Sequence, residues 1–181
     1  SQLQRSPGVF FDQSIHPNGT KLFQGRIIPF RGSWVDFTTD INDSIFCIID
    51  RRRKFPVTML LRALGFSTNA DIFKAFNCIE QVKIKSKSID SFIGSTVVED
   101  IIDEETGEIF IEGGSELLQE NIEDLKKAKI ESIEIVNQNK DFHSMMLLNT
   151  MQKDPSKNTE ESLSIVYQLL RSGEPPNLET A

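Results

Sequence analysis

The sequence predicts a mixed α+β fold, in which short strands pack with helices and a small β-rich module is inserted between them. Short apolar runs bounded by glycine, proline or asparagine alternate with segments whose apolar residues recur at helical spacing. The clearest strand-then-helix pattern lies in residues 26–66, which also hold the single tryptophan. Between residues 94 and 136 the chain becomes acidic and rich in β-branched residues, which indicates the separate module.

The first elements predict a hairpin. A Pro7-Gly8 turn signal precedes the apolar run 9–11, which is typical of a buried strand. Residues 17–19, Pro-Asn-Gly, supply the next turn, and 21–28 fit the returning strand. Pro29 has no N–H to donate, so the strand should end there or lie at a sheet edge.

The run 45–49 is apolar on both faces, which favours a strand buried in the centre of a sheet. The cluster Arg51–Lys54 follows, so four basic side chains should sit at the end of a rigid strand. Pro56 fits the first turn of a helix over 57–64, and Gly65 is placed to end it.

Residues 89–137 are predicted to form a small acidic module. Two apolar runs, 101–102 and 109–111, flank the turn DEETGE, in which Gly107 can adopt a positive φ. The turn does not fit a calcium-binding loop, because its glycine is one position too early. A solvated hairpin turn is the favoured interpretation.

The last part of the chain returns to helix. Asp141 is placed to cap a helix over 142–151, and Asn158 with Glu161 forms a capping-box pair for the next one. We therefore divide the chain into a first part at 1–88, the inserted module at 89–137 and a helical second part at 138–181.

The net charge of −7 is distributed unevenly. Residues 1–64 hold nine Lys or Arg against five Asp or Glu, a local charge of +4. Residues 65–136 hold seven against sixteen, a local charge of −9. Because binding responds to the local field, the first third is the part suited to a polyanion.

Several functional classes find no support. The sequence has no GxxxxGK[ST], GxSxG, HExxH or GxGxxG motif. Cys47 and Cys78 lack a CxxC spacing, so we expect two buried, reduced thiols rather than a zinc site. His16 and His143 are too isolated to suggest a metal site. The longest apolar run, 45–49, is far shorter than the roughly 20 residues of a membrane-spanning helix, and no leader follows Ser1, so we expect a soluble protein.

Two features could carry nucleic-acid binding. The cluster Arg51–Lys54 could contact phosphates, although such runs also form solvated faces or pair with nearby acids. Trp34 could stack on an unpaired base at roughly 1–3 kcal/mol, although a large apolar ring is also commonly buried in a core. Arg5 could bind a base edge or a phosphate, or serve as a structural ion-pair partner.

Four segments closely resemble the lobe of the bacterial RNA polymerase β subunit. They are RSPGVFFD at 5–12, RIIPFRGSWVDF at 26–37, IDRRRKFPVTMLLRALGF at 49–66 and RSGEPPNLETA at 171–181. The resemblance covers residues 1–78 and 138–181 in the family's order. It implies a discontinuous lobe domain built from both ends of the chain.

The resemblance also implies which residues bind DNA. Trp34 matches a tryptophan that stacks on an unpaired non-template base, and Arg5 matches an arginine that lines the pocket for the next base. Asp50 matches an acid near the same surface. Arg51 and Arg52 would face the DNA.

By resemblance, the chain is a non-catalytic part of DNA-directed RNA polymerase, a cytoplasmic enzyme. It would form one jaw of the downstream DNA channel and contact the non-template strand of the transcription bubble. The implied partners are DNA, the β′, α and ω subunits and a σ factor. The family holds its catalytic Mg²⁺ on another subunit, so neither activity nor a cofactor is expected here. Gln2 resembles the edge of the rifamycin pocket, most of which lies outside this sequence.

The acidic module at 89–137 should repel DNA, so we expect it on the outer surface as a spacer or a docking site for a protein factor. A second class of function is a protein-interaction scaffold, in which the basic cluster pairs with acidic surfaces of other subunits or of σ. An independent enzyme would require a pocket of clustered carboxylates with perturbed pKa values, which the sequence does not display.

Overall fold

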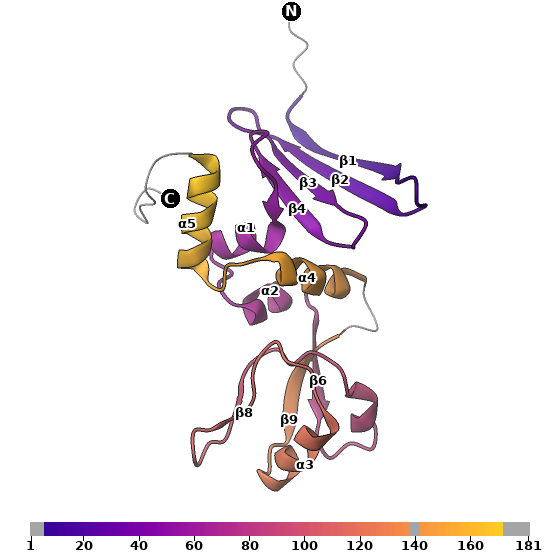
Figure 1. Cartoon of the computed structure of the whole chain (residues 1–181), viewed down its shortest axis with the longest axis vertical. Coiled ribbons are helices and arrows are strands. Elements are labelled where there is room, and N and C mark those ends of the chain that lie inside the picture. Colours follow the sequence, from indigo (N-terminus) through magenta and orange to yellow (C-terminus); the bar gives the residue numbers. More distant parts are fainter. Residues whose placement is uncertain (1–5, 138–141, 172–181) are drawn as a thin grey trace, which may run out of the picture. The chain divides into compact units, whose positions relative to one another are not determined.

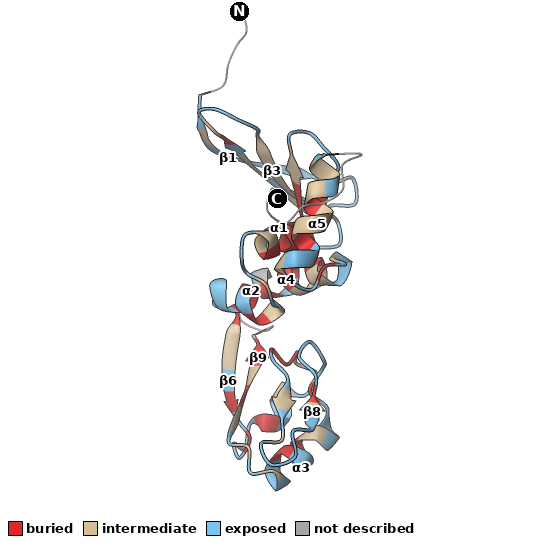
Figure 2. Cartoon of the chain, turned by 90° about the vertical axis from the view of Figure 1, so that its left-hand side faces the viewer, coloured by how far each residue is buried: buried red, intermediate tan, exposed pale blue. Residues whose placement is uncertain are grey.

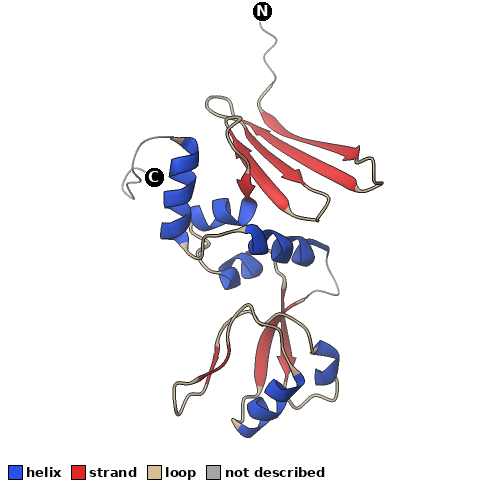
Figure 3. Cartoon of the chain, viewed as in Figure 1, coloured by secondary structure: helices blue, strands red, loops and turns tan. Residues whose placement is uncertain are grey.

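The structure, a computed structural model, describes residues 6–137 and 142–171. Figure 1 shows its helices and strands, and Figure 3 colours them by type. In chain order they are β1 (Gly8–Ile15), β2 (Lys21–Ile28), β3 (Val35–Thr39), β4 (Ile45–Ile49), β5 (Phe55–Pro56), α1 (Val57–Ala63), α2 (Asn69–Ala75), β6 (Ile79–Lys83), the short 3₁₀ helix η1 (Ile89–Phe92), β7 (Ile101–Ile102), β8 (Ile109–Ile111), α3 (Gln119–Lys127), β9 (Ser132–Val136), α4 (Phe142–Lys153) and α5 (Thr159–Leu170). The predicted mixed α+β class is confirmed.

The chain forms two compact units. Unit 1 contains residues 1–68 and 145–181, and unit 2 contains residues 69–144. Unit 2 is wider than the module predicted at 89–137, because β6 precedes that range and pairs with β9 inside it. This pairing joins residues about fifty positions apart in the sequence, such as Lys83 and Ser132, and local patterns carry no signal for it.

Unit 1 is built on an antiparallel sheet with its strands in sequence order, from β1 to β5. The helices α1 and α5 pack against the β3–β5 half of this sheet. The buried side chains of this core are Cys47, Phe55, Val57, Met59 and Val166. Figure 2 shows the buried residues gathered where the helices meet the sheet.

The β1–β2 half of the sheet stays uncovered by the described residues. Strand pairing places Val9 opposite Ile27 and Phe11 opposite Gly25, on the same face that forms the core under β3 and β4. The Phe11 side chain is nevertheless 84% exposed and Val9 is 57% exposed. The predicted strand at 9–11 is confirmed as part of β1, but its predicted burial is wrong, because α1 and α5 cover only the β3–β5 half of the sheet.

A buried ion pair joins distant parts of unit 1. The Arg62 Nε donates to the Asp154 carboxylate at 3.2 Å, and both side chains are almost fully buried. The Thr58 hydroxyl donates to the same carboxylate oxygen at 2.7 Å, and the Ser156 N–H donates to the other oxygen at 2.9 Å. These contacts fix the C-terminal end of α4 against α1, and so position the helices behind the sheet.

Unit 2 has its own apolar core between the β6–β9 pair, the β7–β8 hairpin and α3. Ile84, Leu117 and Leu125 are fully buried there, and Ile133 and Ile135 of β9 point inward. The segment 96–98 lies along the other edge of β9, where the Val98 N–H donates to the Glu134 carbonyl at 3.1 Å.

Candidate nucleic-acid interface

Strand pairing brings Trp34 and the basic cluster together. Val35 of β3 lies opposite Ile49 of β4, so Trp34 just before β3 comes opposite Asp50 just after β4. The Asp50 N–H donates to the Trp34 carbonyl at 3.0 Å. Residues far apart in the sequence therefore meet at one end of the sheet.

The basic cluster begins in a tight turn. Asp50 and Arg51 have φ values of 52° and 55°, and the Arg52 N–H donates to the Ile49 carbonyl at 3.0 Å. Two successive left-handed residues closed by such a bond are the pattern of a type I′ turn, which favours Asn-Gly. Asp50, Arg51 and Arg52 are all exposed. The turn therefore presents two guanidinium groups to solvent on a short loop.

Trp34 is half-buried, so its ring is neither sealed in the core nor fully free. The Arg26 guanidinium carbon lies 5.3 Å from the centroid of the indole. The Asp36 carboxylate accepts from Arg26 Nε at 2.6 Å and from Arg26 Nη2 at 3.4 Å. Asp36 thus holds the Arg26 guanidinium, which lies over one face of the Trp34 ring.

Sequence reasoning missed the roles of Arg26 and Asp36. The two residues are ten positions apart and lie opposite each other only because β2 and β3 pair in this register. An arginine and an aspartate on successive predicted strands near a tryptophan indicate an ion pair beside the ring only weakly. The pairing register of the two strands is needed to show that they meet.

A second cationic patch lies beyond the turn, around the Phe46 ring. Lys54 Nζ and Lys153 Nζ lie 4.7 and 5.3 Å from the centroid of that ring. Lys153 also donates to the Asp40 carboxylate at 3.0 Å. Burial alone would raise the pKa of Asp40, but hydrogen bonds from Lys153 and from backbone N–H groups outweigh it and hold the pKa below 3.8.

Two predicted site residues, Gln2 and Arg5, lie outside the described residues, and their roles stay predictions.

Among the described residues, Cys47 and Cys78 are buried free thiols, as predicted. In the same part of the chain, no three His, Cys, Asp or Glu side chains are grouped so that they could hold a metal ion. No helix of the described residues is long and apolar enough to cross a membrane.

Comparisons with known proteins point to one family. A family model described as RNA polymerase Rpb2, domain 2, matches residues 5–134. The DNA-directed RNA polymerase subunit beta of Flavobacterium psychrophilum is 39% identical over 198 residues, which cover 100% of the chain and 16% of that protein. The proteins with the same name from Porphyromonas gingivalis and Chlorobium chlorochromatii are 42% and 40% identical, over 97% and 100% of the chain. The chain spans 14–16% of the length of these relatives.

Proposed function

Because the chain belongs to the RNA polymerase Rpb2 domain 2 family, as a lobe fragment of a bacterial β subunit, we propose that it forms one jaw of the downstream DNA channel and contacts the non-template strand of the transcription bubble. Trp34 stacks on an unpaired base in this proposal. Arg51 and Arg52 contact the phosphates beside it.

The observation that carries this proposal is the junction of Trp34 with the exposed turn at 50–52. A sequence-tolerant single-strand site combines cationic groups that follow the backbone with an aromatic ring on which a base stacks. The hydrogen bond between Asp50 and Trp34 holds these two parts at one end of the sheet. Arg26 packs over one face of the indole, which reduces the conformational entropy that the ring loses when a base stacks on it.

The proposed contribution of the chain is positioning, without a chemical step. Its partners in this proposal are DNA, the β′, α and ω subunits and a σ factor, within a cytoplasmic enzyme. Nucleotidyl transfer and the Mg²⁺ that supports it are assigned to another subunit.

The test replaces Trp34 in the assembled polymerase and measures the lifetime of the open bubble. We expect Trp34→Ala to weaken bubble stability by about 1–3 kcal/mol, the usual contribution of base–aromatic stacking. Trp34→Phe is the matched variant, because it keeps an aromatic face and should lose less. An abasic nucleotide opposite the ring supplies the control, since the effect of Trp34→Ala should then disappear. An unchanged lifetime with an intact fold, or a loss that persists without the base, would contradict the stacking role.

One observation favours a second candidate function, a scaffold that docks σ or other polymerase subunits. The β1–β2 face carries exposed apolar side chains, among them Phe11 and Ile15, which are 84% and 68% exposed. An apolar surface of this kind suits a protein contact rather than DNA. Phe11→Ser should then weaken assembly of the polymerase and leave the base dependence of bubble lifetime unchanged. If Phe11→Ser instead left assembly unchanged, the scaffold function would be contradicted, and direct DNA contact alone would be favoured.

A further inference from the structure

We propose that an open groove in unit 2 docks a basic, amphipathic segment of a partner protein. The residues that line this groove lie between Lys74 and Glu134, so all belong to unit 2. Trp34 and the turn at 50–52 belong to unit 1. The inference is therefore independent of the proposed DNA contact, and either can fail without the other.

The groove forms where two extended segments separate. Segment 96–98 runs along β9 and is joined to it by backbone hydrogen bonds, among them the bond from the Val98 N–H to the Glu134 carbonyl. After Glu99 the chain leaves β9 and enters the β7–β8 hairpin. One wall of the groove is thus residues 99–105, and the other is the end of α3 together with residues 129–134.

The floor of the groove is apolar. Ile101, Phe110 and Ile130 are partly buried and pack on the core of unit 2, while one side of each is left accessible. Ile102 lies beside them and is 49% exposed. An apolar floor of this kind favours a ligand that withdraws its own apolar atoms from water.

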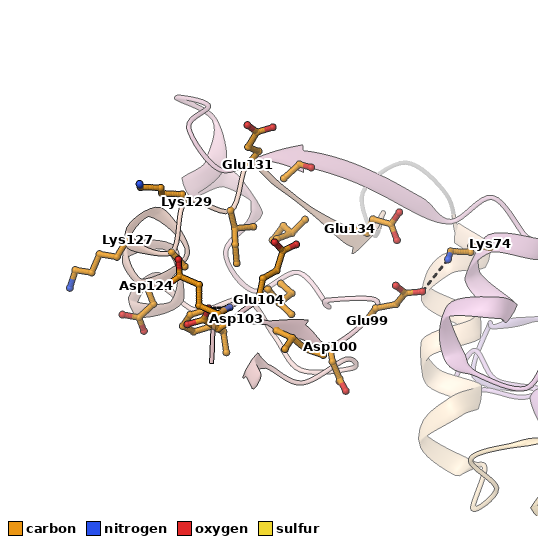
Figure 4. Close-up of a pocket in the computed structure, with 18 residues that line it drawn as sticks. Lys74, Glu99, Asp100, Asp103, Glu104, Asp124, Lys127, Lys129, Glu131 and Glu134 are labelled. Atoms are coloured by element: carbon orange, nitrogen blue, oxygen red, sulfur yellow. Dashed lines mark hydrogen bonds and ion pairs between the residues drawn. The ribbon is translucent and has the colours of Figure 1, made fainter. Parts of the chain in front are cut away.

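The rim of the groove is acidic. Eight carboxylates and three lysines line it, namely Glu99, Asp100, Asp103, Glu104, Glu105, Asp124, Glu131, Glu134, Lys74, Lys127 and Lys129. Lys74 is already paired with Glu99 at 3.0 Å, and this contact raises the pKa of Lys74. In Figure 4, Lys127 and Lys129 extend outward at one end, whereas Glu104 lies between the two walls.

The chemistry of the groove selects the class of ligand. The groove has a volume of about 1080 Å³ and is open to solvent, so it can admit an extended segment. The described residues offer no grouping of ligands for a metal ion. Lysine and arginine match both parts of the site, because their stems can cover an apolar floor while their charged ends reach the carboxylates. The expected occupant is therefore a protein segment in which basic and aliphatic residues alternate.

The direct test measures binding of a labelled peptide to the full 181-residue chain by fluorescence anisotropy. The probe peptide alternates lysine with leucine, and two comparison peptides alternate lysine with serine and glutamate with leucine. We expect the lysine–leucine peptide to bind at low salt and the lysine–serine peptide to bind at least about ten-fold more weakly, because it cannot use the apolar floor. Equal binding of both basic peptides, or no binding of either, would overturn the proposal.

Charge-reversal variants locate the site. Glu104→Lys combined with Glu131→Lys should weaken binding of the lysine–leucine peptide by roughly ten-fold or more, since two attractions become repulsions. Glu120→Lys with Glu123→Lys on α3 makes the same change of charge away from the groove lining. This control pair should have a much smaller effect. An equal loss in both pairs would show that the peptide follows net charge alone, and would overturn the groove.

A second pair of variants tests the floor. Ile102 and Ile109 face each other across the β7–β8 hairpin and are 49% and 51% exposed, but only Ile102 lines the groove. Ile102→Ser should weaken binding of the lysine–leucine peptide by about five-fold, because roughly half of an isoleucine side chain no longer gains from burial. Ile109→Ser should leave the affinity unchanged. Thermal unfolding of both variants checks that the hairpin is intact, and equal affinities of the two would count against an apolar floor.

Discussion

Replacing Arg51 with glycine should make the turn more stable and DNA binding weaker. Arg51 holds a φ of 55°, a left-handed conformation that costs a non-glycine residue about 1–2 kcal/mol. Glycine adopts it without that cost, but loses about 0.5–1 kcal/mol through its greater freedom in the unfolded chain. The net change for Arg51→Gly is a gain of about 0–1.5 kcal/mol in the free energy of unfolding.

The same substitution removes one exposed guanidinium group. If Arg51 contacts a phosphate of the single strand, the slope of log K against log salt should fall by about 0.7. The residue would then weaken the fold slightly while serving the ligand, which is the expected signature of strain kept at a functional position. If the Arg51 side chain contacts only water, Arg51→Gly should change the free energy of unfolding and leave the salt slope of DNA binding unchanged.

Two measurements check this prediction, urea unfolding of the chain and the salt dependence of bubble lifetime in the assembled polymerase. Arg53→Gly is the matched control, because Arg53 is also exposed but is absent from the left-handed region. It removes the same charge and should lower stability by up to about 1 kcal/mol. A loss of stability in Arg51→Gly as large as the loss in Arg53→Gly would refute the argument from strain, because release from the left-handed conformation would then contribute nothing. An unchanged salt slope would refute the phosphate contact.

Three further predictions concern unit 1. Asp154→Ala should lower the free energy of unfolding in urea by about 3–5 kcal/mol, because it removes one partner of the buried pair with Arg62; a loss below about 1 kcal/mol would contradict that role. The folded-state pKa of Asp40 is lowered, so Asp40 contributes to the free energy of unfolding in full above pH 3.8. This contribution is lost as the pH falls through the folded-state pKa. Asp40→Asn should therefore flatten the acid limb of the stability profile, and an unaltered limb would exclude the contact with Lys153 as its source. Burial, and to a smaller extent the charge of the nearby Asp36 carboxylate, raises the pKa of Cys47 to about 12. Iodoacetamide should therefore leave this thiol unmodified at pH 8 in the folded chain. Rapid labelling would disprove its burial.

Local chemistry was sufficient to predict several elements. The apolar run 45–49 is β4, and Gly65 follows the end of α1 with a φ of 115°. The Asn158 side chain accepts from the Glu161 N–H at 2.9 Å at the start of α5, which is one half of the predicted capping box. The Glu161 carboxylate accepts from the Lys157 N–H at 2.9 Å rather than from Asn158, so the other half differs. These features depend on residues within a few positions of one another, so their signals lie in the sequence itself.

Burial and contacts that depend on residues distant in the sequence could not be predicted from local patterns. The run 9–11 has the pattern of a buried strand, but its burial depends on which elements reach it, and α1 and α5 do not. The contact of Arg26 with Trp34 follows from the β2–β3 register, which the hydrophobic pattern did not specify. Arg51 and Arg52 were predicted as DNA contacts from the basic run and from the resemblance to a family, whereas the residues that pack against the indole had to be found by geometry.

The two proposed surfaces are compatible because each rejects the ligand of the other. The groove in unit 2 is rimmed by carboxylates such as Glu104 and Glu131, which repel DNA phosphates. The turn at 50–52 carries guanidinium groups, which repel a lysine-rich segment. Added salt weakens both contacts and therefore cannot separate them, but charge reversal can. Glu104→Lys with Glu131→Lys should weaken binding of the lysine–leucine peptide by roughly ten-fold or more and leave the salt slope of the DNA contact unchanged. A change in both would mean that the surfaces act through one electrostatic field rather than as separate sites.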